Sequence, residues 1–145
     1  MNSKNNYQGL IVAGTHSSAG KSSVSMGLMR LLKDSGWSIK PFKVGPDYID
    51  PAHHTRACNQ PSYNLDTVMC TKKYVKDLFD DVVQKNDLAI IEGVMGLYDG
   101  ASPISEKGST AEIAKLLNLP VLLVIDGRAL SRSSAAMVLG FLQLD

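Results

Sequence analysis

Cysteine, aromatic residues and net charge are all scarce in this chain. Its 145 residues include two cysteines, Cys58 and Cys70, and only 6% aromatic residues, and 15 basic against 14 acidic side chains leave a net charge of +1. Two cysteines cannot build a disulfide scaffold, and their spacing is not that of a metal knuckle. A near-neutral chain also gives no electrostatic reason to bind nucleic acid or an anionic membrane. We therefore expect a cytoplasmic protein that binds neither.

Long apolar runs are also missing. The longest, residues 120–125, is far shorter than the roughly 20 residues that cross a bilayer, and the first eight residues contain no apolar core of a signal peptide. The balance of 44% hydrophobic and 20% charged residues is that of an ordinary soluble protein. At this length, one domain with one core is expected.

Short apolar runs alternate with helical patterns along the chain. Buried strands are predicted at residues 10–13, 39–44, 88–91 and 121–125, and amphipathic helices at residues 24–32, 75–82, 113–117 and 135–142. This alternation predicts an α/β fold with a doubly wound, mainly parallel sheet. The pattern stops where another strand would follow, so we expect the fold to be truncated at its carboxyl end. Residues 45–64 are predicted to form a long irregular loop with a functional role.

The segment after the first predicted strand has the composition of a phosphate-binding loop. It reads GTHSSAGKSS and leads directly into an amphipathic helix. In such loops, backbone N–H groups cradle phosphate oxygens, the lysine reaches the outer phosphates, and the serine hydroxyl can ligate magnesium. The expected ATP-binding residues are Gly14, Thr15, Ser18, Ala19, Gly20, Lys21, Ser22 and Ser23. Between the two glycines there is one residue more than the strict Walker spacing allows.

Acidic side chains follow the second and third long strands. Asp47 lies in the run KVGPDYIDPAH, and Glu92 opens the run EGVMGLYDG. Ligand sites in open α/β sheets lie at the carboxyl ends of the strands, and carboxylate oxygens are preferred ligands of Mg²⁺. We therefore expect Ser22, Asp47 and Glu92 to be the metal ligands. A solvated strand-end charge is the alternative for Glu92, and Asp50 ranks below Asp47 because Asp-Pro is a common turn pair.

These two runs and the phosphate loop together resemble the cobyrinic acid a,c-diamide synthases, and the loop alone is also similar to that of dethiobiotin synthetase. A fourth run, VIDGRALSRS, resembles the same family. The resemblance spans essentially the whole chain. It implies that residues 1–145 are an ATP-binding amidoligase domain with a dethiobiotin synthetase-like P-loop fold. It also implies that the carboxy-terminal glutamine amidotransferase domain of the family is absent.

The resemblance implies a reaction as well. In that family, Mg-ATP activates the a and c acetate carboxylates of cobyrinic acid, or of a related tetrapyrrole, as acyl phosphates in cobalamin biosynthesis. Ammonia, supplied free or from glutamine, then displaces the phosphate. On this view Lys43 faces the transferred phosphate, while Tyr48 and Asp99 orient the tetrapyrrole carboxylate. The sequence does not decide whether the chain assembles as a homodimer.

Several other polar residues have ordinary structural interpretations. His16 is better explained by the conformation of the loop than by catalysis, and structural hydrogen bonding explains His53 and His54 at least as well as catalysis does. Asp126 is better explained as a cap at the end of a strand, and a nucleotide contact is its alternative role. Three other kinds of protein share some of these sequence features. Dethiobiotin synthetase and cobyric acid synthase share the loop, although the run GPDYIDP argues against the former. A partitioning ATPase, which is a nucleotide-dependent dimer switch, has an extra lysine where this chain has His16.

Overall fold

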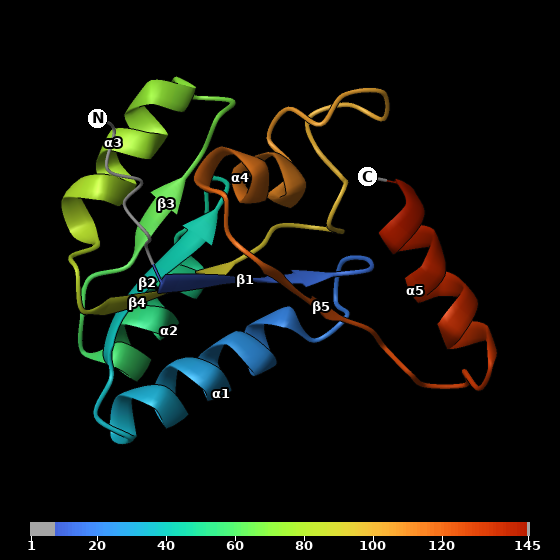
Figure 1. Cartoon of the computed structure of the whole chain (residues 1–145), viewed down its shortest axis with the longest axis horizontal. Helices are drawn as coiled ribbons and strands as arrows, with labels where there is room; N and C mark the ends of the chain where they lie inside the picture. The colour runs from blue at the N-terminus through green and yellow to red at the C-terminus, as the bar shows by residue number, and fades with distance from the viewer. Residues whose placement is uncertain (1–7, 145) are drawn as a thin grey trace.

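The sheet forms the centre of the molecule and is parallel throughout (Figure 1). A computed structural model describes residues 8–144; the amino-terminal segment, for which no signal peptide is expected, lies almost wholly outside the described residues. The strands are β1 (Gln8–Gly14), β2 (Ser38–Val44), β3 (Tyr63–Leu65), β4 (Asp87–Glu92) and β5 (Val121–Val124). Their order in the sheet is β3-β2-β4-β1-β5, and each of the four pairings of neighbouring strands is parallel. All four predicted strands are therefore confirmed.

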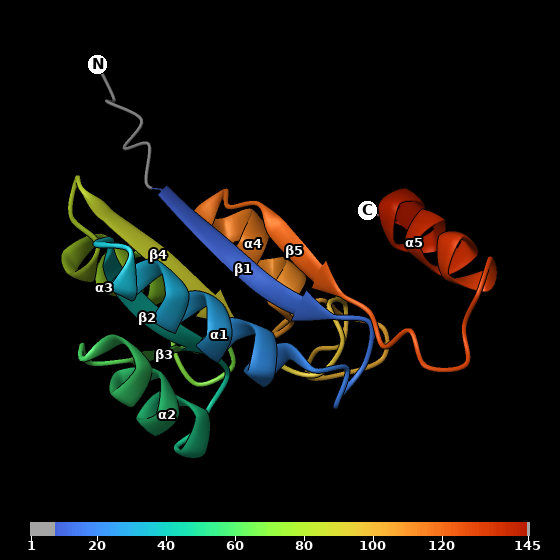
Figure 2. The same cartoon turned by 90° about the horizontal axis from the view of Figure 1, so that it is seen from below.

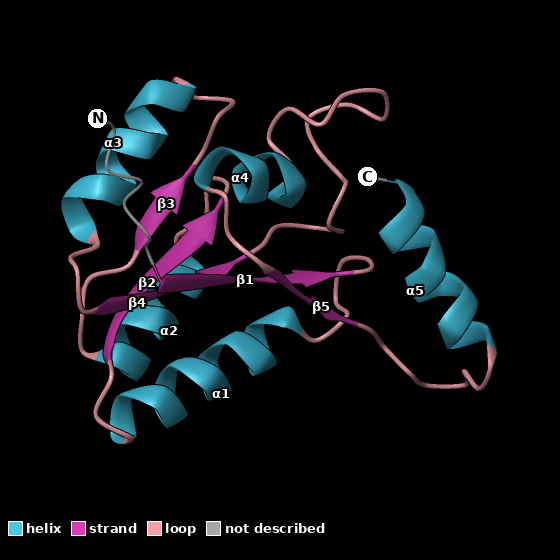
Figure 3. Ribbon diagram, viewed as in Figure 1, coloured by secondary structure: helices cyan, strands magenta, loops and turns pink. Residues whose placement is uncertain are grey.

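Helices cover both faces of the sheet. The helices of the described chain are α1 (Lys21–Asp34), α2 (Ile49–Cys58), α3 (Lys72–Val82), α4 (Thr110–Leu117) and α5 (Ser133–Leu144), and the first four form these two layers. Helices α1 and α2 lie on one face and α3 and α4 on the other, as the view from below shows (Figure 2). The α/β class, the doubly wound parallel sheet and the four predicted helices are confirmed (Figure 3).

Alternation along the central strands sends neighbouring residues to opposite faces. Ile91 joins the apolar cluster of Phe42 and Phe79, whereas Ile90 joins the cluster of Met29 on the side of α1. Because side chains in a strand repeat every two residues, Glu92 points to the same face as Ile90. Lys43 pairs in register with Glu92 at the carboxyl ends of β2 and β4. The pattern that builds the core thus also brings a cation and an anion together beneath α1 and α2.

The prediction of an irregular loop over residues 45–64 is wrong. This stretch contains helix α2 and the start of strand β3. The helix escaped prediction because it lacks an apolar face: only His54 and Cys58 are buried along it. Its start is marked instead by Asp47, whose Oδ1 accepts hydrogen bonds from the backbone N–H groups of Ile49 (2.8 Å) and Asp50 (3.1 Å).

Helix α5 stands apart from the two helical layers (Figure 1). None of its residues is buried, and it is attached through Phe141, whose ring stacks on Tyr98 at 5.5 Å and whose carbonyl accepts the Tyr98 hydroxyl at 2.8 Å. Across residues 8–144, no helix has both the length and the apolar character required to traverse a bilayer.

Candidate nucleotide and magnesium site

The loop between β1 and α1 has the backbone of a phosphate cradle. Gly20 has a φ of 102° and immediately precedes the first residue of α1, while Ser18 also has a positive φ of 65°. A side chain at Gly20 would reach only Val124, at 3.9 Å, so the space before the helix is open. The free N–H groups and the positive end of the α1 dipole both face a ligand placed there.

A second feature of this loop fits a phosphate ligand. The Oγ1 atom of Thr15 is buried and has no hydrogen-bond partner within the described part of the chain, although its backbone N–H donates to the Val124 carbonyl at 3.1 Å. A buried hydroxyl is normally paired, so an orphaned one beside an anion cradle is suited to a phosphate oxygen. Ala19 is buried in the loop, whereas Ser23 is exposed on α1.

Lys21 lies at the centre of the site, with only 8% of its surface exposed. Its Nζ donates to the backbone carbonyls of Met95 at 2.7 Å and His16 at 3.3 Å. Burial and the nearby charge of Lys43 lower the pKa of Lys21 from its ordinary value. The ammonium group is therefore held next to the loop by uncharged carbonyl oxygens. A phosphate oxygen bound in the loop would replace them as a charged acceptor and form a stronger hydrogen bond.

Ser22 and Glu92, two of the residues predicted as magnesium ligands, contact each other close to Lys21. The Ser22 hydroxyl donates to Glu92 Oε1 at 2.6 Å, although the two residues are 70 positions apart. The other carboxylate oxygen, Oε2, lies 2.6 Å from His54 Nε2. Burial opposes ionisation of Glu92, but the hydrogen bonds from His54 and Ser22 and the charge of Lys43 outweigh it, so its pKa lies below the ordinary range.

Lys43 lies in a second charged pair next to Glu92. Its Nζ donates to the Gly93 carbonyl at 2.8 Å and lies 3.7 Å from Asp50 Oδ2. Burial, together with the negative charges of Glu92 and Asp47, raises the pKa of Asp50. The sequence ranked Asp50 below Asp47, but it is Asp50 that reaches the buried lysine.

Asp47 has a different set of contacts. Its carboxylate accepts hydrogen bonds from the two N–H groups at the start of α2. Burial raises the pKa of Asp47, but these hydrogen bonds and the charge of Lys43 outweigh it, so the pKa lies below its ordinary value. Among the described residues, no contact joins Asp47 to Ser22 or Glu92. Its assignment as a metal ligand stays a prediction. Tyr48, the next residue, is 89% exposed and so is free to meet a ligand.

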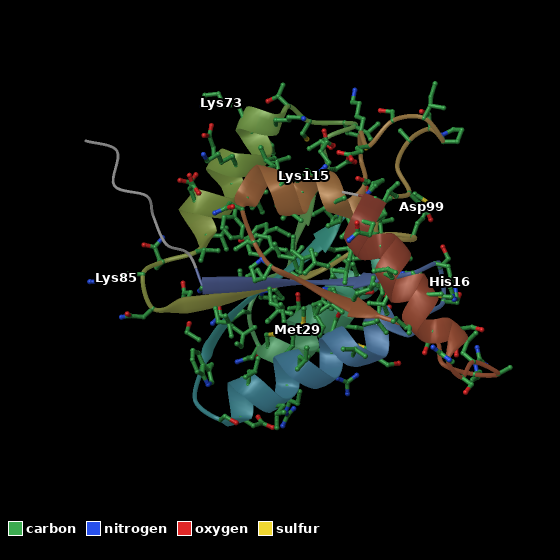
Figure 4. The ribbon with its side chains drawn as sticks, turned by 45° about the vertical axis from the view of Figure 1, so that its right-hand side comes forward. His16, Met29, Lys73, Lys85, Asp99 and Lys115 are labelled. Carbon is green, nitrogen blue, oxygen red and sulfur yellow. The ribbon has the colours of Figure 1, made fainter. Side chains whose placement is uncertain are left out.

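Asp99 belongs to a turn that is packed against the phosphate loop. Its Oδ2 accepts from the Gly96 N–H at 3.0 Å, and the Leu97 N–H donates to the Gly14 carbonyl at 2.8 Å. Asp99 and His16 of the loop lie at the same side of the molecule, whereas Lys85 lies at the opposite side (Figure 4). The structure therefore gives Asp99 a turn-forming contact at the border of the site.

The donor set fits magnesium better than a metal held by protein alone. Within residues 8–144, no group of three or more His, Cys, Asp or Glu side chains could hold a metal ion. Mg²⁺ is commonly bound through one or two protein oxygens with the remaining positions taken by phosphates and water. Ser22 Oγ and Glu92 Oε1 are two protein oxygens 2.6 Å apart, so the donor set is compatible with this mode of binding.

His54 and Asp50 are the functional candidates that sequence reasoning underrated. They are four residues apart on α2, so they lie on the same face of the helix. That spacing was the one signal available in the sequence, and it becomes informative only once residues 49–58 are known to be helical. Asp126, in contrast, pairs locally with Arg128, which lowers its pKa to about 2.

The chain is similar to known proteins over almost all of its length. A family model described as an AAA domain matches residues 8–143. The cobyrinate a,c-diamide synthase of Methanobrevibacter smithii is 50% identical over 136 residues, which cover 94% of this chain and 30% of that protein. The enzymes of the same name from Syntrophotalea carbinolica and Archaeoglobus fulgidus are 48% and 45% identical over the same length. The chain thus spans about 30% of the length of these curated relatives.

Proposed function

Because the chain belongs to the AAA domain family, whose P-loop binds nucleotide, we propose that it is the ATP-binding amidoligase domain of a cobyrinate a,c-diamide synthase. The reaction is the ATP-dependent amidation of the a and c acetate carboxylates of cobyrinic acid or a related tetrapyrrole. The observation that carries the proposal is the pairing of Ser22 with Glu92 at 2.6 Å, directly beside Lys21. The names of the relatives support the substrate class.

The proposed chemistry has two balanced steps. A substrate carboxylate oxygen attacks the γ-phosphorus of ATP, the bond to the β-phosphate oxygen breaks, and ADP leaves with that electron pair. Ammonia then attacks the acyl carbon, the carbon–oxygen bond to phosphate breaks, and the nitrogen loses a proton. The first step brings two anions together and the second expels an anionic phosphate, so catalysis consists of positioning and of neutralising charge.

The residues of this chain divide that task. The loop N–H groups and Lys21 hold the phosphates, and the buried ammonium of Lys43 offsets the charge of the transferred group. Magnesium, when bound at Ser22 and Glu92, supplies further positive charge to the phosphate oxygens. Tyr48 and Asp99, in the loops after β2 and β4, orient the incoming carboxylate. In the full enzyme, a glutaminase domain provides the ammonia from glutamine.

The test is to incubate the chain with Mg-ATP, cobyrinic acid and an ammonium salt, and to measure corrinoid-dependent phosphate release together with amide formation by mass spectrometry. A Lys43→Ala variant should lose both products, whereas Lys85→Ala, at the far end of the sheet, should keep them. ATP-dependent dimerisation without corrinoid-dependent phosphate release would instead favour a dimer switch of the partitioning ATPase type.

A further inference from the structure

Helix α2 presents two side chains, one turn apart, to the charged ends of β2 and β4. Asp50 lies 3.7 Å from Lys43, and His54 lies 2.6 Å from Glu92. Both His54 and Glu92 are almost fully buried, with 0% and 1% of their side-chain surfaces exposed. The helix therefore matches an acid to the lysine and an imidazole to the glutamate.

The two oxygens of Glu92 have different partners from different helices. Oε1 accepts from Ser22 of α1, and Oε2 faces His54 of α2. Because a carboxylate only accepts, the hydrogen between His54 and Glu92 belongs to Nε2, which leaves Nδ1 facing the Ser62 hydroxyl at 3.3 Å. A hydrogen bond to one oxygen restricts rotation of the carboxylate, so it also restricts the direction of the other oxygen.

We propose that His54 is a positioning residue for the magnesium site: it holds Glu92 Oε2 so that Oε1 stays directed at Ser22 and at the magnesium ion that the two residues would share. This inference rests on the proposed Mg-ATP site. A partner that orients a ligating or hydrogen-bonding carboxylate commonly changes metal affinity when removed, even though it does not touch the metal. On this view α2 belongs to the nucleotide site, although none of its residues lies in the phosphate loop.

The test compares two substitutions of His54 that differ in where they can place an N–H group. Gln can reproduce a donor at the position of Nε2, whereas the shorter Asn cannot. For each variant, the Mg²⁺ concentration giving half of the ATP-dependent thermal stabilisation is measured at fixed ATP. We expect His54→Asn and His54→Leu to raise that concentration about tenfold. His54→Gln should stay close to the parent protein.

Cys58→Ala is the matched control for helix packing. Cys58 is buried one turn beyond His54 and packs in the cluster of Met29 without contacting Glu92. It should lower the melting temperature without nucleotide, yet leave the magnesium midpoint unchanged. ATP affinity measured in EDTA should be the same in every His54 variant, because the contacts of the phosphate loop are untouched.

Each outcome decides the question. If His54→Asn matches His54→Gln, or if Cys58→Ala moves the magnesium midpoint as far as His54→Asn does, His54 only anchors the helix and the inference is wrong. Ser22→Ala separates this failure from a failure of the site itself. If Ser22→Ala leaves the midpoint unchanged, magnesium does not bind there, and the proposed site falls together with the role of His54.

Discussion

Substituting Lys21 by alanine should nearly abolish stabilisation by ATP while preserving the fold. In the described part of the chain, Lys21 Nζ donates to the carbonyls of Met95 and His16, and Lys21 is not one of the residues that form the apolar clusters. Losing such bonds costs about 1–2 kcal/mol, or a drop in melting temperature of about 3–6 °C for a domain of this size. The contact with phosphate is charge-assisted, and its loss should weaken ATP binding about 100-fold, equivalent to about 2.7 kcal/mol.

These values predict a clear thermal-shift result. At an ATP concentration of about 100 times the parent Kd, binding stabilises the parent by about 2.7 kcal/mol, which corresponds to about 8 °C. At the same ATP concentration the variant gains about 0.4 kcal/mol, or about 1 °C. Lys85→Ala, at the opposite side of the molecule, serves as the matched charge control and should behave as the parent does. An ATP-dependent rise in Lys21→Ala equal to that of the parent would refute the phosphate-loop assignment.

Four further predictions follow from the contacts described. Glu92→Gln should raise the Mg²⁺ concentration needed for ATP-dependent stabilisation, because it removes one charged oxygen beside Ser22. Asp47→Asn tests the weaker of the metal assignments in the same way. If its magnesium titration is identical to that of the parent, Asp47 is a helix cap only. Asp99→Ala should reduce amidation, measured by mass spectrometry, more than it reduces ATP binding; the reverse would place Asp99 at the nucleotide. A glutaminase nucleophile is a thiolate within hydrogen-bond reach of a histidine. Burial raises the pKa of the Cys58 thiol to about 11, and among the described residues no contact joins the exposed Cys70 to a histidine, so the chain should release no glutamate from glutamine. Release that disappears in Cys58→Ala or Cys70→Ala would contradict this. Phe42→Ala should lower the free energy of unfolding in urea by about 3–5 kcal/mol, because Phe42 is fully buried against Phe79 at 5.4 Å; a loss below about 1 kcal/mol would contradict the packing.

The phosphate loop and the core strands could be predicted because their signals are local. A buried strand, a glycine-rich turn and an amphipathic helix follow one another within residues 8–34, and each has its own composition. Glu92 was also predictable, since it closes an apolar strand whose carboxyl end must lie beside that of β1 in a parallel sheet.

Helix α2 and the contacts of His54 could not be predicted in the same way. A helix whose buried residues are a histidine and a cysteine has no apolar stripe to reveal it. The bond between His54 and Glu92 joins residues 38 positions apart, and only the packing of α2 brings them together. For the same reason the sequence favoured Asp47 over Asp50, because a residue that caps a helix and one that forms an ion pair look alike before the start of the helix at Ile49 is known.

The four-residue spacing of Asp50 and His54 makes α2 intolerant of changes in length. Inserting one residue between them would turn the following part of the helix by about 100°, and His54 would leave Glu92 while Asp50 stayed on Lys43. Substitution at the exposed positions between them, Ala52 and His53, leaves that spacing intact. Insertions and deletions in this region should therefore be accepted only after the helix ends, in the turn that leads from Asn59 to β3.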